Sequence, residues 1–175
     1  NVDDVVGGVF LPEDGQINPS GLTQALAKGA RAGGATILEN TKVTDISTKN
    51  GKVMGVDIEG GHISADVVVN CTGMWGRSVG AFTKTLVPLH ACEHFYVVTD
   101  PIEGVTPDLP VLRDPDNYAY FKEDAGKILL GAFEPQAKPW GMDGIREDFC
   151  FDELPSDMDH FMPVLERAMN RMPAL

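Results

Sequence analysis

A helix is predicted between Asn18 and Gly33, because Leu22, Leu26 and Ala30 recur on one helical face. Asn18 suits the start of a helix, and Gly33 begins a glycine pair that tolerates the backbone of a helix end. Apolar runs predict one strand before this helix and one directly after it, over residues 5–10 and 35–38. A helix that leads at once into a strand is typical of a parallel βαβ unit.

Short strands in meander order are predicted next. They cover residues 43–46, 53–58 and 62–65, with turns at residues 49–52 and 60–61. The following run, residues 66–70, is rich in valine and is typical of a strand buried on both faces.

From Val87 onward, strands separated by polar, proline-rich loops predict a mainly antiparallel sheet. The strands are expected over residues 96–99, 111–112, 118–122 and 128–133. By alternation, Tyr118 and Tyr120 would share one face of the sheet. The last helix, residues 157–172, is predicted from an apolar stripe of Met158, Phe161, Met162, Leu165 and Met169. The patterns together predict a chain of mixed α/β and α+β class.

Composition limits the possible partners of the protein and the compartment in which it resides. The 175 residues carry a formal net charge of −12, which argues against nucleic acid or an anionic membrane as the main partner. The three widely spaced cysteines, Cys71, Cys92 and Cys150, form no C-x-x-C pair and favour a reducing compartment over a disulfide framework. The chain starts without Met and stops just after a helix, so we expect it to be a piece of a longer polypeptide.

Residues 90–96 hold two histidines, a cysteine, a glutamate and a tyrosine. A metal site is the least favoured interpretation, since the spacing matches none of the common zinc motifs. An acid/base site needs one histidine close to a substrate. The third interpretation is a hydrogen-bonded start of a strand, which we favour for His90 and Cys92.

A second candidate site is the turn Cys71-Thr72-Gly73, which follows the valine-rich run. Small residues at the carboxyl end of a buried strand let a ligand approach the backbone, although a tight turn without a ligand would leave the same pattern. The phosphate-binding motif G-x-G-x-x-G is absent from the chain. Without further information Tyr120 and Trp75 are expected to be packing residues.

In combination, these segments resemble the D-amino-acid-oxidase-type FAD-dependent oxidoreductases. The most similar branch comprises dimethylglycine dehydrogenase, sarcosine dehydrogenase, dimethylglycine oxidase and the regulatory subunit of pyruvate dehydrogenase phosphatase. The segments that carry the resemblance are Gly7-Gly8-Val9-Phe10, Asp14-Gly15, Asn18-Pro19, Gly34-Ala35, residues 67–75, residues 94–99 and residues 109–114.

The resemblance implies a partial FAD-binding Rossmann-like domain over residues 14–85. It implies a substrate domain with a mainly antiparallel sheet over residues 86–156, to which residues 1–13 add a strand, and a helix over residues 157–175. The residues that it implies for FAD binding are Val43, Cys71, Thr72, Gly73 and Trp75. The family's glycine-rich phosphate loop is not in the chain, so we expect the isolated chain to be inactive and to lose FAD.

The resemblance further implies that His94 and Tyr120 manage the proton of a substrate amine while hydride passes to the flavin. The expected substrate is dimethylglycine or sarcosine, and the expected electron acceptor is an electron-transfer flavoprotein or oxygen. Folate would bind to domains outside this chain. The protein would be cytoplasmic in a bacterium or lie in the mitochondrial matrix of a eukaryote.

A non-catalytic role remains open beside this enzymatic one. Residues 88–96 especially resemble the phosphatase regulatory subunit, which keeps the same fold and acts by binding.

Overall fold

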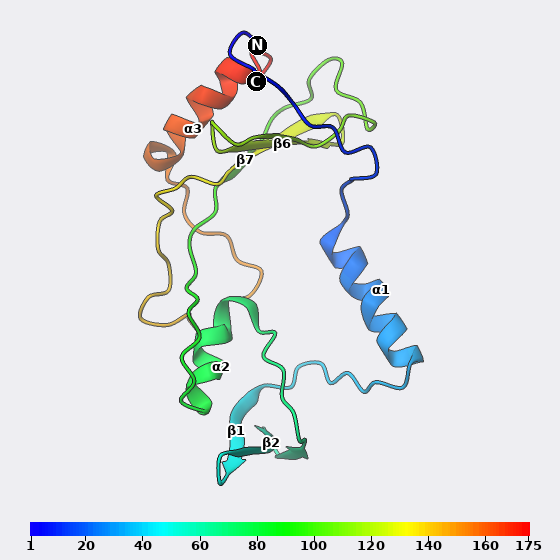
Figure 1. The fold of residues 1–175 in the computed structure, drawn as a ribbon, viewed down its shortest axis with the longest axis vertical. Coiled ribbons are helices and arrows are strands. Elements are labelled where there is room, and N and C mark those ends of the chain that lie inside the picture. The colour runs from blue at the N-terminus through cyan, green and yellow to red at the C-terminus, as the bar shows by residue number, and fades with distance from the viewer. The chain divides into compact units, whose positions relative to one another are not determined.

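The computed structural model describes residues 1–175, which form two compact units (Figure 1). The first unit contains Asn1–Ile17, Cys92–Lys138 and Phe151–Leu175, and the second contains Asn18–Ala91 and Pro139–Cys150. The chain therefore passes repeatedly from one unit to the other.

The first unit is built on a four-stranded antiparallel sheet with the strand order β4-β7-β6-β5. The strands are β4 (Tyr96–Val98), β5 (Leu112–Asp114), β6 (Ala119–Asp124) and β7 (Lys127–Ala132). Ala125 and Gly126 join β6 to β7 with φ values of 53° and 81°. Two consecutive positive φ values are the mark of the turn that best fits the twist of a hairpin. The predicted antiparallel sheet is confirmed.

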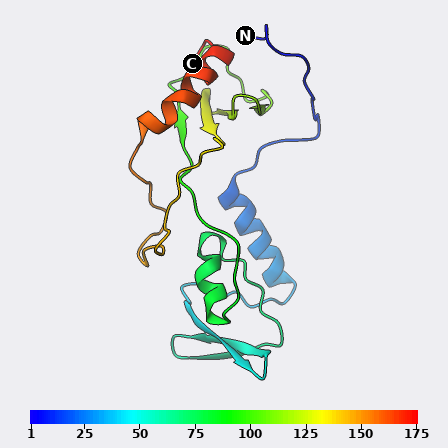
Figure 2. The same ribbon diagram turned by 60° about the vertical axis from the view of Figure 1, so that its left-hand side comes forward.

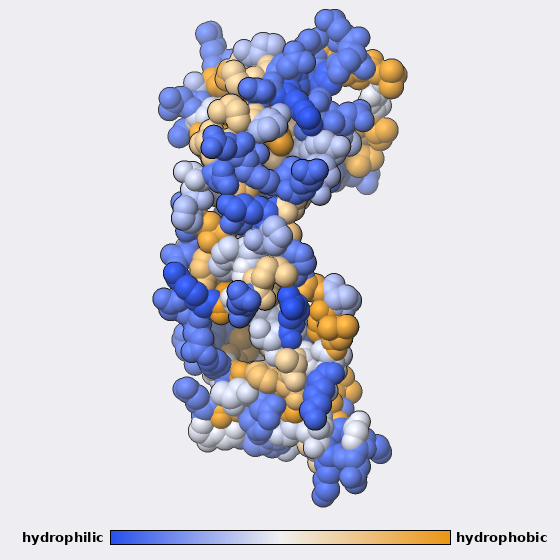
Figure 3. All heavy atoms as spheres, turned by 90° about the vertical axis from the view of Figure 1, so that its left-hand side faces the viewer, coloured by the Kyte–Doolittle hydropathy of each residue, from blue (hydrophilic) through white to orange (hydrophobic).

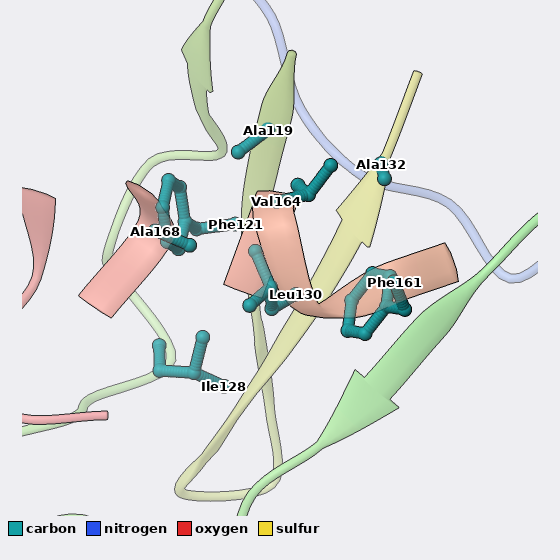
Figure 4. Packing of buried hydrophobic residues seen from close by; sticks show 8 residues of the cluster. All are labelled: Ala119, Phe121, Ile128, Leu130, Ala132, Phe161, Val164 and Ala168. Carbon is teal, nitrogen blue, oxygen red and sulfur yellow. The ribbon is translucent and has the colours of Figure 1, made fainter. Parts of the chain in front are cut away.

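One face of this sheet is covered by α3 (Met158–Arg171), as Figure 4 shows. Phe161, Val164 and Ala168 of the helix pack on Leu130 of β7, which is completely buried. The other buried members of this cluster are Ala119, Phe121, Ile128 and Ala132. Asp157 starts the helix, because its carboxylate accepts a hydrogen bond from the N–H of His160.

The predicted helix is confirmed, but the predicted apolar stripe is only partly right. Met158, Met162 and Met169 remain exposed, whereas Val164 and the small Ala168 are buried. The small Ala168 side chain allows the helix to approach the sheet closely, so the side of the helix that carries Ala168 is the side that is buried.

The second unit contains the predicted meander. Its antiparallel strands are β1 (Val43–Lys49), β2 (Lys52–Ile58) and β3 (Gly61–Ser64). A short 3₁₀ turn, η1 (Gly73–Trp75), leads into α2 (Gly76–Phe82), which lies beside β1 (Figure 2).

The first helix, α1 (Pro19–Ala32), also belongs to this unit. The Asn18 side chain accepts a hydrogen bond from the N–H of Gly21, and Gly34 ends the helix with a φ of +92°. The helix begins and ends as predicted, but it buries none of its residues. No helix of the chain has both the length and the apolar character that crossing a membrane requires.

Three predicted strands are not formed. Residues 5–10, 35–38 and 66–70 pair with no other segment. A strand needs a neighbour for its N–H and C=O groups, and residues 1–175 supply none to these segments. Their side chains are exposed instead, with Val6, Val67 and Val69 among the most exposed apolar residues. Apolar patches consequently reach the surface (Figure 3).

The prediction that Tyr118 and Tyr120 share a face is wrong. Tyr118 precedes β6 and has a φ of +59°, which breaks the alternation of the strand. Its ring lies 5.9 Å from the Arg167 guanidinium of α3, on the side of the sheet that the helix covers.

Arg171 ties the end of α3 to the N-terminal segment and to β5. Its guanidinium donates to the buried carboxylate of Asp114 at 2.6 Å and to Asp4 at 2.8 and 3.0 Å. Burial raises the pKa of Asp114, but hydrogen bonds from Arg171 and Asn117 outweigh it, so this pKa lies below its usual value.

Replacing Leu130 with Ala should lower the free energy of unfolding by about 2–5 kcal/mol, because it opens a cavity under α3. The measurement is urea unfolding followed by circular dichroism. Leu112→Ala, at an exposed position of the same sheet, is the matched control and should cost much less. Equal losses would mean that Leu130 is not at the centre of the core.

Acidification should weaken the first unit through Asp114. An unfolded aspartate has a pKa near 3.8, so the stabilisation is complete above that pH and is lost as the pH falls through the lower folded-state pKa. Urea unfolding from neutral pH to about pH 3 should show a smaller loss of stability for Asp114→Asn than for the wild type. The exposed Asp116→Asn variant should follow the wild type, and three parallel curves would contradict the assignment.

Candidate active site

A row of four residues crosses the sheet of the first unit on the face away from α3. Strand register aligns Tyr96 of β4 with Gly131 of β7, Gly131 with Tyr120 of β6, and Tyr120 with Arg113 of β5. The neighbours of Tyr120 in β6 are buried under α3, so alternation turns Tyr120 to the open face.

Gly131 leaves the space that the Tyr120 side chain occupies. A Cβ atom at position 131 would collide with the Tyr120 ring, including its hydroxyl end. The ring therefore lies flat across the backbone of β7, which only a glycine permits.

His94 meets Tyr120 on this open face. Its Nε2 lies 3.0 Å from the Tyr120 hydroxyl oxygen, and the two rings are nearly parallel, with 3° between their planes. Phe133 lies against both, its ring centroid 5.0 Å from that of His94 and 5.3 Å from that of Tyr120. Two of the predicted site residues are thus brought together from positions 26 residues apart.

The electrostatic setting keeps Tyr120 protonated near neutral pH. Burial is the main cause that raises its pKa, Tyr96 adds to the rise, and the positive charge of Arg113 opposes it. A protonated phenol can donate a hydrogen bond to a neighbouring imidazole or accept one from it. The pair can therefore hold or pass one proton.

Ion pairs fix the segment that leads to His94. Lys138 lies 2.9 Å from the Asp157 carboxylate and 3.3 Å from that of Glu93, and the N–H of Glu93 donates to the Lys138 carbonyl. The hydrogen bond to Asp157 is the main cause that raises the pKa of Lys138. Glu93 therefore acts as a structural anchor beside His94, and no group of three His, Cys, Asp or Glu side chains is placed to hold a metal ion.

The second unit holds the other predicted site residues. The Asn70 side chain accepts hydrogen bonds from the N–H and the hydroxyl of Thr72 and donates to the carbonyl of Gly76. Cys71 and Trp75 are both exposed on the turn that Asn70 holds. Val43 starts β1, where it pairs with Ile58 of β2.

Comparison with known proteins identifies the relationship. The family model described as "FAD dependent oxidoreductase" matches residues 1–175. The chain belongs to this family.

Individual relatives match nearly the whole length of the chain. The chain is 39% identical, over 98% of its length, to 4-methylaminobutanoate oxidase (formaldehyde-forming) of Paenarthrobacter nicotinovorans. It is 37% identical to the mitochondrial pyruvate dehydrogenase phosphatase regulatory subunit of Mus musculus and 36% identical to the mitochondrial sarcosine dehydrogenase of Mus musculus, in both cases over 100% of its length. The chain covers 21%, 20% and 19% of these three proteins, which is about a fifth of their length.

A solved structure supports the fold. L-proline dehydrogenase from P. horikoshii superimposes with a TM-score of 0.73 and 27% sequence identity, over 94% of this chain and 41% of that one. The mixed fold with antiparallel sheets is thus that of FAD-dependent oxidoreductases.

The backbone of the Asn70–Trp75 turn is accessible, which is one requirement for contact with the family's cofactor. Gly73 has a φ of +56°, and no atom lies within 4 Å of the point where a Cβ would stand, so a flat group can approach this backbone closely. The glycine pairs of the chain do not form the G-x-G-x-x-G loop that would bind a pyrophosphate.

Sequence patterns alone missed several residues of these sites. Asn70 carries the recognisable signal of an asparagine two residues before a threonine, which favours a side-chain-supported turn. Gly131, Phe133 and Arg113 have no such local signal, because only the register of three strands places them beside Tyr120.

Gly131→Ala should displace the Tyr120 ring and break its contact with His94. We expect a loss of about 1–3 kcal/mol in the free energy of unfolding from overpacking. The loss of nuclear Overhauser effects between the two rings would report the displacement. Gly29→Ala, at an exposed position of α1, is the control. It should leave the contacts between the two rings unchanged and should not lower the free energy of unfolding, because alanine favours a helix more than glycine does. A variant that retains the ring contact would show that the backbone, not the glycine, sets the Tyr120 position.

Proposed function

We propose that this chain is the part of an FAD-dependent amine oxidoreductase that presents His94 and Tyr120 to the N-methylated amine of a small amino acid. Dimethylglycine and sarcosine are the proposed substrates. The observation that carries the proposal is the 3.0 Å contact between His94 Nε2 and the Tyr120 hydroxyl on the open face of the sheet. The relatives named for sarcosine and 4-methylaminobutanoate support it, since both compounds combine a methylated amine with a carboxylate.

His94 would prepare the amine for oxidation. A carbon bound to nitrogen gives up hydride readily only when the nitrogen lone pair is free, so the ammonium form of the substrate must first lose its proton. With Nε2 donating to the Tyr120 oxygen, the other ring nitrogen of His94 carries the lone pair that accepts this proton. Tyr120 and Phe133 would keep the imidazole in place.

FAD, when bound, supplies the acceptor for the hydride. The residues that we propose for contact with it are Val43, Cys71, Thr72, Gly73 and Trp75. The phosphate loop would come from another part of a longer polypeptide, as would any domain that passes the one-carbon unit to folate. The final electron acceptor would be an electron-transfer flavoprotein or oxygen.

The location would follow the organism. We propose the mitochondrial matrix for a eukaryotic source and the cytoplasm for a bacterial one. The names of the two mouse relatives, which call those proteins mitochondrial, support the organelle.

A second candidate function is regulation by binding. The 37% identity to the phosphatase regulatory subunit supports it as directly as the similar identity to sarcosine dehydrogenase supports an enzyme. In this alternative the fold would retain the His94–Tyr120 pair, but the pair would act on no substrate.

The absorbance spectrum of the complete polypeptide that contains this chain distinguishes the two. Under anaerobic conditions, dimethylglycine or sarcosine should bleach the flavin bands of the purified protein. Bound flavin that no methylated amine reduces would contradict the oxidoreductase and favour the regulatory function.

His94→Ala in the same polypeptide should slow flavin reduction by about 10²- to 10⁴-fold, because the amine loses its proton acceptor. Rapid-mixing absorbance measures the rate, and the flavin-to-protein ratio should stay that of the wild type. His90→Ala is the matched control and should reduce flavin at the wild-type rate. An unchanged rate in His94→Ala would remove this histidine from the mechanism.

A further inference from the structure

Arg113 belongs to the same cluster as the His94–Tyr120 pair. It faces Tyr120 across the β5–β6 ladder. Its guanidinium carbon lies 4.8 Å from the centroid of the Phe133 ring, which also contacts His94 and Tyr120. A cation is therefore held within reach of the proposed site for the amine.

No carboxylate of the chain engages this cation. The ion pairs of the other arginines involve Arg31, Arg146 and Arg171. The neighbouring Asp114 is turned to the opposite face of the sheet, where Arg171 and Asn117 bind it. In a chain with 26 acidic and 14 basic residues, an exposed arginine without an acidic partner is available to an external anion.

The stacking of Arg113 on Phe133 suits carboxylate binding. A guanidinium that rests on an aromatic ring keeps the N–H groups at its edge free, and these match the two oxygens of a carboxylate. The ring also limits the motion of the guanidinium, so less conformational entropy is lost when an anion binds.

We propose that Arg113 binds the carboxylate of the amino-acid substrate whose amine faces His94 and Tyr120. This inference rests on the proposed function and adds the second point of attachment. Binding at both ends selects molecules that carry a carboxylate and a methylated amine over simple methylated amines. It also orients the N-methyl group, because the amine and the carboxylate are fixed at different points of one sheet face.

The test compares an acid with its neutral analogue in the complete flavoprotein. For Arg113→Met, the Michaelis constant for dimethylglycine should rise about 10- to 100-fold, the range expected for a charge-assisted hydrogen-bonded pair. The constant for N,N-dimethylglycinamide, which has no carboxylate, should stay within about twofold of the wild type, because it never gains this pair. Arg113→Lys keeps the charge without the planar fork and should fall between the two.

Arg167→Met is the matched control, since Arg167 also lies over an aromatic ring in this unit, that of Tyr118, but on the face that α3 covers. It should leave both constants unchanged. Equal effects of Arg113→Met on the acid and the amide would overturn the proposal, because they would assign Arg113 to bracing Phe133 instead. Unchanged constants for the acid would overturn it as well.

Isothermal titration of dimethylglycine separates this inference from the proposed function. If the wild-type flavin is not reduced by any methylated amine, the proposed oxidation fails. Binding of dimethylglycine that is lost in Arg113→Met would then still support the carboxylate site. Absence of binding to the wild type would overturn both.

Discussion

The packing of α3 on one face of the four-stranded sheet determines the chemistry available on the other. Leu130 and its neighbours in β6 and β7 are buried against the helix, so the alternate residues of the same strands turn away from it. Tyr120 is one of these, and Arg113 beside it has the same orientation. The core thus produces the site indirectly, by deciding which side chains are left for the open face.

Adjacent residues of β5 illustrate this division. Asp114 is buried and is held by Arg171, which joins the sheet to α3 and to the N-terminal segment. Arg113, one position earlier, is exposed and stacks on Phe133. A one-residue shift in the pairing of β5 would exchange their environments, placing the arginine under the helix and the carboxylate beside Tyr120. The register is therefore as important for the proposed site as the residue types.

The second unit has a different balance between local and long-range structure. Its hairpin and its capped helix are set by neighbours in sequence, such as Asn18 with Gly21 and Asn70 with Thr72. The valine-rich segment before the turn is unpaired and largely exposed, because a strand depends on a partner. The chain spans about a fifth of the length of its curated relatives, and it belongs with them to the FAD-dependent oxidoreductase family.

The sequence by itself determined α1, α3, the meander with its turns and the antiparallel character of the first unit. These features follow from interactions between residues a few positions apart: helical spacing, caps, and glycines with positive φ. His94 and Tyr120 were named from a family resemblance, not from periodicity. Only the tertiary structure decided that Tyr118 turns away from Tyr120, that Gly131 makes room for the Tyr120 ring, and that Phe133 and Arg113 complete the cluster. The physical reason is strand register, since it brings residues from four separate segments onto one face and leaves no local pattern in any of them.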